Sequence, residues 1–139
     1  MADSFSLQRF VDAQEAVFEQ VVEELRAGQK RRHWMWFVFP QLKGLGFSSM
    51  AQHFGIAGRD EATAYLAHPI LGVRLRECTR LVIVVEGRTA EDIFGTVDAM
   101  KFRSSMTLFS SVAGEESEFV EALGKYFGGQ PDPLTLDRL

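Results

Sequence analysis

The spacing of apolar residues between positions 71 and 85 constrains the fold more than any other feature of this sequence. The stripe consists of Leu71, Leu75, Cys78, Val82 and Val85, at successive spacings of four, three, four and three. Such spacing places all these side chains on one face of an α-helix. The embedded string LVIVV is by itself typical of a strand, but the longer pattern favours a helix. We therefore predict one helix here, stopped by Gly87.

Helical spacing recurs along most of the chain. The apolar residues between Leu7 and Leu25 indicate either one long helix or two short ones with a break near Gln14. Further helices are expected at 48–54, 61–67, 96–112 and 115–127, with a helical turn at 89–95 and a short tail at 134–139. No strand signal is strong, and strands do not alternate with helices. The sequence thus predicts an all-α fold, a single compact multihelical domain at 1–139 with about six to eight helices.

Composition argues against several classes of protein. The formal net charge of −4 and the isoelectric point near 5.4 give no general attraction to nucleic acid or to an anionic membrane. The longest wholly apolar run, at 34–39, is far too short to span a bilayer, and the N-terminus lacks an apolar signal core. Cys78 is the only cysteine, which fits a reducing compartment. We expect a cytoplasmic protein that does not bind membranes and has no general affinity for nucleic acid, although a local basic patch remains open.

The familiar enzyme motifs are missing from the sequence. There is no GxxxxGK[ST] phosphate loop, no Rossmann glycine fingerprint, no HExxH zinc helix and no GxSxG elbow. The histidines His33, His53 and His68 are scattered without metal-ligand spacing. Cys78 lies on an apolar helix face, so we interpret it as a packing residue and not a nucleophile. The sequence assigns no reaction, cofactor or oligomeric state, and it predicts no metal site.

Polar residues interrupt an otherwise apolar helix at 96–112. Asp98, Lys101 and Ser105 share one side of it, and Ser104 lies beside them. Apolar residues on several sides are typical of a buried helix, and a buried charge needs a partner. The stripe is either a structural Asp98–Lys101 pair with hydroxyls bonded to the preceding turn, or the polar wall of a ligand cavity. The helix alone favours the structural alternative.

The run RRHWMWFVFPQ, at 31–41, is rich in aromatic residues and follows a basic cluster. Its continuous apolar character does not distinguish a helix from a strand. Trp34 and Trp36 either fill the core or, because an indole N–H needs an acceptor, form the wall of a site that is wet at one end. The flanking cations, a glycine-hinged loop and Ser48 at a helix start would suit an anionic or nucleotide-like ligand.

Several long motifs resemble the domain-of-unknown-function family 1810. They are LQRFVDAQ at 7–14, KRRHWMWFVFPQLKGLGFS at 30–48, YLAHPILGVRLRE at 65–77 and IFGTVDAMKFRSSMTLF at 93–109, and the resemblance covers essentially the whole chain. It implies a small, mostly helical, single-domain protein of bacteria and some fungi, with no established activity. Members are sometimes described as calpastatin-like, and nothing in this sequence supports a calpain inhibitor. The motifs also contain many polar residues, which brings the ligand-site alternative level with the structural one.

We therefore predict a ligand pocket between the 33–41 segment and the 98–107 helix. Lys101 would bind an anionic group, with Asp98 orienting it, and an indole would form an aromatic wall. The expected ligand is an anionic small molecule such as a nucleotide or an ADP-ribose-like compound. The candidate ligand-binding residues are Trp34, Trp36, Gln41, Ser48, Asp98, Lys101, Ser104 and Ser105, and the candidate proton-transfer residues are His33 and His68.

Two other functions fit the same residues. Exposed tryptophans would make the protein a non-catalytic module for protein–protein interaction. Arg31 and Arg32 beside the tryptophans would suit single-stranded RNA, although the acidic net charge opposes this. The orientation of Trp34 and Trp36, inward beside Lys101 or outward as a patch, distinguishes the interaction module from the ligand pocket.

Overall fold

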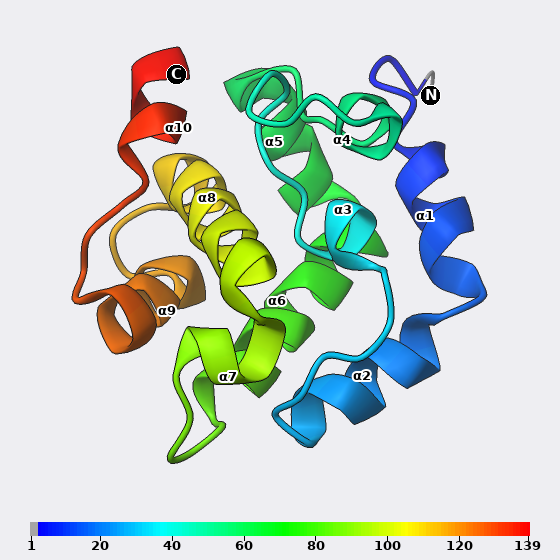
Figure 1. Ribbon diagram of the computed structural model, residues 1–139. Coiled ribbons are helices and arrows are strands. Elements are labelled where there is room, and N and C mark those ends of the chain that lie inside the picture. The colour runs from blue at the N-terminus through cyan, green and yellow to red at the C-terminus, as the bar shows by residue number, and fades with distance from the viewer. Residues whose placement is uncertain (1–2) are drawn as a thin grey trace.

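The computed structural model describes residues 3–139, which form ten α-helices and no strand (Figure 1). The helices are α1 (Gln8–Glu15), α2 (Phe18–Arg26), α3 (Met35–Val38), α4 (Ser49–His53), α5 (Arg59–Ala67), α6 (Leu71–Ile83), α7 (Ala90–Phe94), α8 (Thr96–Ala113), α9 (Glu118–Phe127) and α10 (Pro133–Arg138). None of the helices within residues 3–139 is both long enough and apolar enough to cross a membrane.

The prediction of an all-α domain is confirmed, but the expected number of six to eight helices is wrong. The stretch at 7–25 divides into α1 and α2, and the ambiguous run at 34–39 contains α3. The expected tail at 134–139 is mostly α10. This helix forms because the Asp132 side chain accepts the backbone N–H of Thr135 and Pro133 occupies the first turn, where its missing N–H costs nothing.

The helix predicted from the spacing at 71–85 is α6. Its buried stripe consists of Leu71, Leu75, Cys78 and Val82. The helix ends at Ile83, so the first three residues of LVIVV lie in its last turn, whereas Val84 caps the helix and Val85, which the prediction included, lies beyond it; none of them is in a strand. Lys125 and Tyr126 of α9 donate hydrogen bonds to the carbonyl groups at this end, which supplies partners that the last turn lacks.

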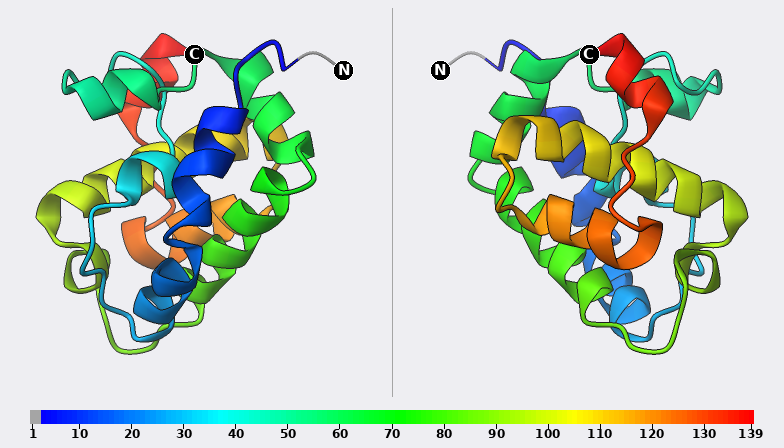
Figure 2. Two further views of the ribbon diagram at one scale, coloured as in Figure 1. Left: turned by 90° about the vertical axis from the view of Figure 1, so that its right-hand side faces the viewer. Right: turned by 90° about the vertical axis from the view of Figure 1, so that its left-hand side faces the viewer.

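The longest helix, α8, is the central element. Its 18 residues pack against α5, α7, α9 and α10. Figure 2 shows α8 crossing the molecule between α10 and α9. Phe102, Met106 and Phe109 of α8 are fully buried. These side chains lie on the inner face of α8. Another face of its first half is turned toward α10 and the loop after α3, and the candidate site lies there.

Most of the aromatic run at 31–41 belongs to the core. Trp34, Phe37 and Phe39 are buried, whereas Trp36 is only partly buried. The ring of Phe39 packs edge-on against Phe102 of α8, with centroids 5.0 Å apart. The run therefore ties the segment after α2 to the centre of the molecule and leaves one indole near the surface.

Candidate functional site

The basic residues Arg31 and Arg32 are fixed in place by the buried carboxylate of Glu24 in α2. It accepts the backbone N–H groups of Arg31 and Arg32, at 2.7 and 3.0 Å. It also accepts the Arg32 guanidinium at 2.7 Å and the Trp34 indole N–H at 2.9 Å. Burial alone raises the pKa of Glu24, but these donors outweigh burial and lower the pKa to about 2. Trp34 is consequently a core residue with a satisfied indole, and it forms no pocket wall.

Two lysines share the carboxylate of Asp98 at the start of α8. Lys30 Nζ lies 2.8 Å from Asp98 Oδ2, and Lys101 Nζ lies 3.7 Å from Asp98 Oδ1. Each ammonium also lies over an indole, Lys30 at 5.2 Å from the ring centre of Trp34 and Lys101 at 5.0 Å from that of Trp36. The Lys30 side chain is 7% exposed and that of Lys101 is 24% exposed. Lys30 is thus the close partner of Asp98, and Lys101 is the lysine that reaches solvent.

Lys101 retains its hydrogen-bonding capacity. Its separation of 3.7 Å from Asp98 is too long for a hydrogen bond, and its ammonium group donates none within residues 3–139. One carboxylate between two ammonium groups leaves the cluster with one net positive charge. An anion that approaches Lys101 therefore meets free N–H donors and a favourable local potential.

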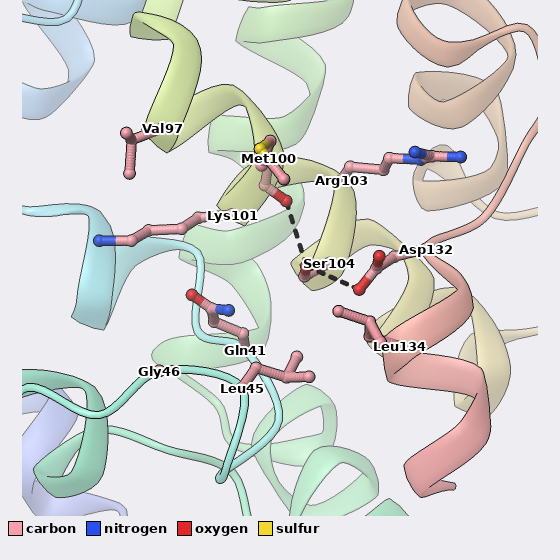
Figure 3. A pocket seen from close by; sticks show the side chains of 10 residues that line it. All are labelled: Gln41, Leu45, Gly46, Val97, Met100, Lys101, Arg103, Ser104, Asp132 and Leu134. Carbon is pink, nitrogen blue, oxygen red and sulfur yellow. Dashed lines mark hydrogen bonds between the residues drawn. The ribbon is translucent and has the colours of Figure 1, made fainter.

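An open cleft of about 240 Å³ lies beside Lys101 (Figure 3). Its walls come from α8, from the loop after α3 and from the start of α10. The apolar lining residues are Leu45, Val97, Met100 and Leu134, and the remaining ones are Gln41, Gly46, Lys101, Arg103, Ser104 and Asp132. Figure 3 shows Lys101 and Gln41 on one side of the cleft, and Asp132 and Leu134 on the other.

The polar groups on the α10 side of the cleft already bond to one another. Asp132 Oδ2 accepts hydrogen bonds from Ser104 Oγ at 3.0 Å and from Thr135 Oγ1 at 2.6 Å. The Asp132 backbone N–H donates to Thr107 Oγ1 at 2.8 Å. Arg103 donates to the carbonyl groups of residues 130 and 131 at 2.9 and 3.0 Å. These contacts hold the start of α10 against α8, so the Ser104 hydroxyl has a structural role in the wall of the cleft.

The other predicted site residues do not gather at the cleft. Ser48 caps α4 by accepting the N–H of Ala51, and His33 is exposed outside the cleft lining. His68 Nδ1 accepts the backbone N–H groups at positions 70 and 71, which makes His68 a cap for the start of α6. Ser105 is fully buried, and its hydroxyl has no hydrogen-bond partner within residues 3–139. Only Gln41, Asp98, Lys101, Ser104 and Trp36 meet at or beside the cleft.

Sequence reasoning missed Lys30 and the residues of the α10 side. Lys30 pairs with a carboxylate 68 positions away, and no local pattern indicates that contact. The string PDP at 131–133 is the signal that would have located α10, because an aspartate followed by proline is a typical helix start. Once that helix is located, Asp132 and Leu134 are assigned to its start.

The described residues contain neither an activated thiol nor a metal centre. Burial raises the pKa of the Cys78 thiol to about 12, so this thiol stays protonated and unreactive. Within residues 3–139, no three His, Cys, Asp or Glu side chains are grouped so that they could hold a metal ion. At the cleft the structure places one ammonium group beside apolar walls.

The fold and the site define the class of protein. It is a small all-α domain with an open, largely apolar cleft and one available lysine at that cleft. The chain belongs to the family described as "Protein of unknown function (DUF1810)", whose model matches residues 4–139. The family suggested by the sequence motifs is thereby confirmed.

A solved structure closely resembles this chain. It is the crystal structure of the conserved hypothetical protein Rv1873 from Mycobacterium tuberculosis. The two chains are 55% identical, the match covers 99% of this chain and 98% of the other, and the TM-score is 0.97. A search of curated proteins gave no match.

Proposed function

We propose that this protein binds a small molecule with one anionic group and an apolar body in the cleft between α8, α10 and the 41–46 loop. The observation that carries the proposal is the state of Lys101. Its ammonium group is oriented by Asp98 and by the face of Trp36, yet it donates no hydrogen bond within residues 3–139. A partly buried ammonium group with free donors at the edge of an apolar cleft is suited to an anion.

A compact ligand fits the cleft better than a nucleotide or an ADP-ribose-like compound. The volume of about 240 Å³ lies below the range of roughly 300–1,000 Å³ that is common for drug-sized ligands. Its described lining contains no aromatic side chain on which a base would stack. Trp36 lines a separate hollow of about 10 Å³ with Gln41, and this hollow is too small for a base. We therefore place small organic anions ahead of nucleotides.

Protein–protein interaction is the second candidate, and one observation favours it. Met100 and Leu134 are 68% and 65% exposed on the same face, which is a contiguous apolar surface of the kind found at interfaces. RNA binding is less favoured because the buried Trp34 offers no face for stacking. The lone buried Cys78 suits a reducing compartment, so we propose that the protein acts in the cytoplasm.

A thermal-shift screen with a matched pair of variants tests the proposed function. The panel contains aliphatic and aromatic carboxylates, sugar phosphates and nucleotides at constant ionic strength. A ligand at ten times its Kd stabilises the folded state by about 1.4 kcal/mol, which raises Tm by roughly 4 °C in a domain of this size. Lys101→Met should lose the response while staying folded, because Asp98 keeps its 2.8 Å contact with Lys30.

Lys43→Met is the matched control. Lys43 is exposed and does not line the cleft, so the variant removes the same charge from a different part of the surface. We expect Lys43→Met to respond to ligands as the wild type does. A panel in which no anion raises Tm, or in which Lys101→Met responds fully, would contradict the proposal and leave the interaction module as the better one.

A further inference from the structure

The charges, the walls and the size of the cleft restrict the class of ligand further. We infer, resting on the proposed function above, that the cleft binds an aliphatic monocarboxylate of about six carbon atoms. The carboxylate binds at Lys101 and Gln41, and the chain follows Met100 and Leu45 toward Leu134. Figure 3 shows these residues in that order across the cleft.

The cation at the Lys101 end of the cleft favours a ligand with a single negative charge. Arg103 is the other cation of the described lining, but its guanidinium is directed away from Lys101 and donates to the carbonyl groups of Gln130 and Pro131 at 2.9 and 3.0 Å, so the two cations do not converge on one anion. Lys101 remains as the cation at its end of the cleft, with the Gln41 side chain beside it, and one ammonium group matches the single charge of a carboxylate. A phosphate monoester carries about −1.5 to −2 charges and is best met by arginine forks or several N–H groups. The end of the cleft at Lys101 and Gln41 offers neither.

The walls select an aliphatic chain. Leu45, Val97, Met100 and Leu134 supply the apolar lining, and all four side chains are aliphatic. Met100 and Leu134 are largely exposed, so a chain laid between them removes apolar surface from water. The thioether of Met100 is flexible and adapts to an unbranched chain. An aromatic or sugar body would gain neither stacking nor hydrogen bonds from these walls.

The volume limits the length of the chain. The cleft of about 240 Å³ lies below the range of roughly 300–1,000 Å³ that is common for drug-sized ligands, so it suits a short chain. Hexanoate has such a chain. Acetate leaves the apolar part of the cleft empty, whereas a nucleotide extends well beyond it.

The test is an NMR titration of the full chain with hexanoate, acetate, hexan-1-ol, hexyl phosphate and AMP. We expect hexanoate to shift the amide resonances of residues 97–104 and 134 in a saturable manner. Acetate has the charge without the chain, and hexan-1-ol has the chain without the charge. Each should bind at least tenfold more weakly than hexanoate, because acetate lacks the apolar contacts of the chain and hexan-1-ol lacks the charge that pairs with Lys101.

A second matched pair tests the chain end of the cleft. Leu134→Ser should weaken hexanoate binding roughly fivefold, because it removes an apolar wall. Leu136→Ser changes a leucine of the same helix that is 46% exposed and lies outside the lining, and it should leave the affinity unchanged. Equal losses in both variants would overturn the assigned orientation of the ligand.

The outcomes separate this inference from the proposed function. If hexyl phosphate or AMP binds more tightly than hexanoate, and Lys101→Met abolishes that binding, the carboxylate inference fails and the proposed function stands. If hexan-1-ol binds as tightly as hexanoate, the ammonium group contributes nothing and both fail. If hexanoate binds most tightly and depends on both Lys101 and Leu134, both are supported.

Discussion

Replacing Glu24 with Gln tests whether one buried carboxylate fixes the basic and aromatic segment beside the cleft. In the folded protein this carboxylate accepts four hydrogen bonds, from the backbone N–H groups of Arg31 and Arg32, the Arg32 guanidinium and the Trp34 indole. Gln has nearly the same size but no charge, and its amide nitrogen must face at least one of these donors. The segment that carries Lys30 and Trp34 then loses its anchor.

The pKa of Glu24 gives the magnitude of this loss. A pKa of about 2, against the ordinary 4.5, means that the folded state favours the charged over the neutral form by roughly 3 kcal/mol. The Arg32 side chain is 55% exposed, so water screens part of its charge. We therefore expect Glu24→Gln to lower the free energy of unfolding by about 2 to 3 kcal/mol at pH 7.

The same pKa fixes the pH dependence. Because folding lowers the pKa of Glu24, its stabilisation is fully present above about pH 4.5 and is lost as the pH falls toward 2. Urea unfolding at pH 7 and at pH 3, followed by tryptophan fluorescence, measures both effects. Glu23→Gln is the control, since Glu23 is the exposed neighbour of Glu24. A cost below about 1 kcal/mol at pH 7, or an equal cost at pH 3, would refute the reasoning.

Three further predictions concern groups whose surroundings the structure defines. Lys30→Met should lower the free energy of unfolding in urea by about 1 to 2 kcal/mol, more than Lys101→Met does, because Asp98 then keeps only its 3.7 Å contact with Lys101. Equal losses in the two variants would contradict the conclusion that Lys30 is the closer partner of Asp98. Ser105→Ala should be neutral or stabilising by about 1 kcal/mol, because the buried hydroxyl has no hydrogen-bond partner within residues 3–139, and a clear loss of stability would show that it has one. The Cys78 thiol should react with Ellman's reagent at pH 8 only in urea, because burial raises its pKa to about 12; rapid reaction of the folded protein would refute this.

The fold was predictable where apolar periodicity extended over several turns. The stripe that begins at Leu71 identified α6 although LVIVV is typical of a strand. The run at 34–39 was ambiguous because it is apolar on every side and holds only the four-residue α3. The helix α10 escaped prediction for the opposite reason. Its leucines, Leu134 and Leu136, point largely to solvent, so no buried stripe exists to be recognised.

The candidate site was partly predictable. The polar stripe on α8 indicated that Asp98 and Lys101 need partners, and Lys101 does lie over Trp36. The sequence did not indicate that Lys30 shares Asp98, because that pairing joins residues far apart in the chain. Nor did it show that Glu24 takes up the indole of Trp34. Such contacts depend on how the helices pack, and they decide which lysine remains available.

Locating a bound anion tests the central claim, that Lys101 and the cleft beside it form a binding site, most directly. The measurement is a set of intermolecular nuclear Overhauser effects between hexanoate and protein in which lysine side chains and the methyl groups of leucine and methionine carry ¹³C. We predict effects from the hexanoate chain to the methyl groups of Met100 and Leu134, with shifts of the Lys101 ε-protons and none at Lys43. Effects only to methyl groups outside the cleft, with Lys101 and Lys43 shifting equally, would contradict the claim.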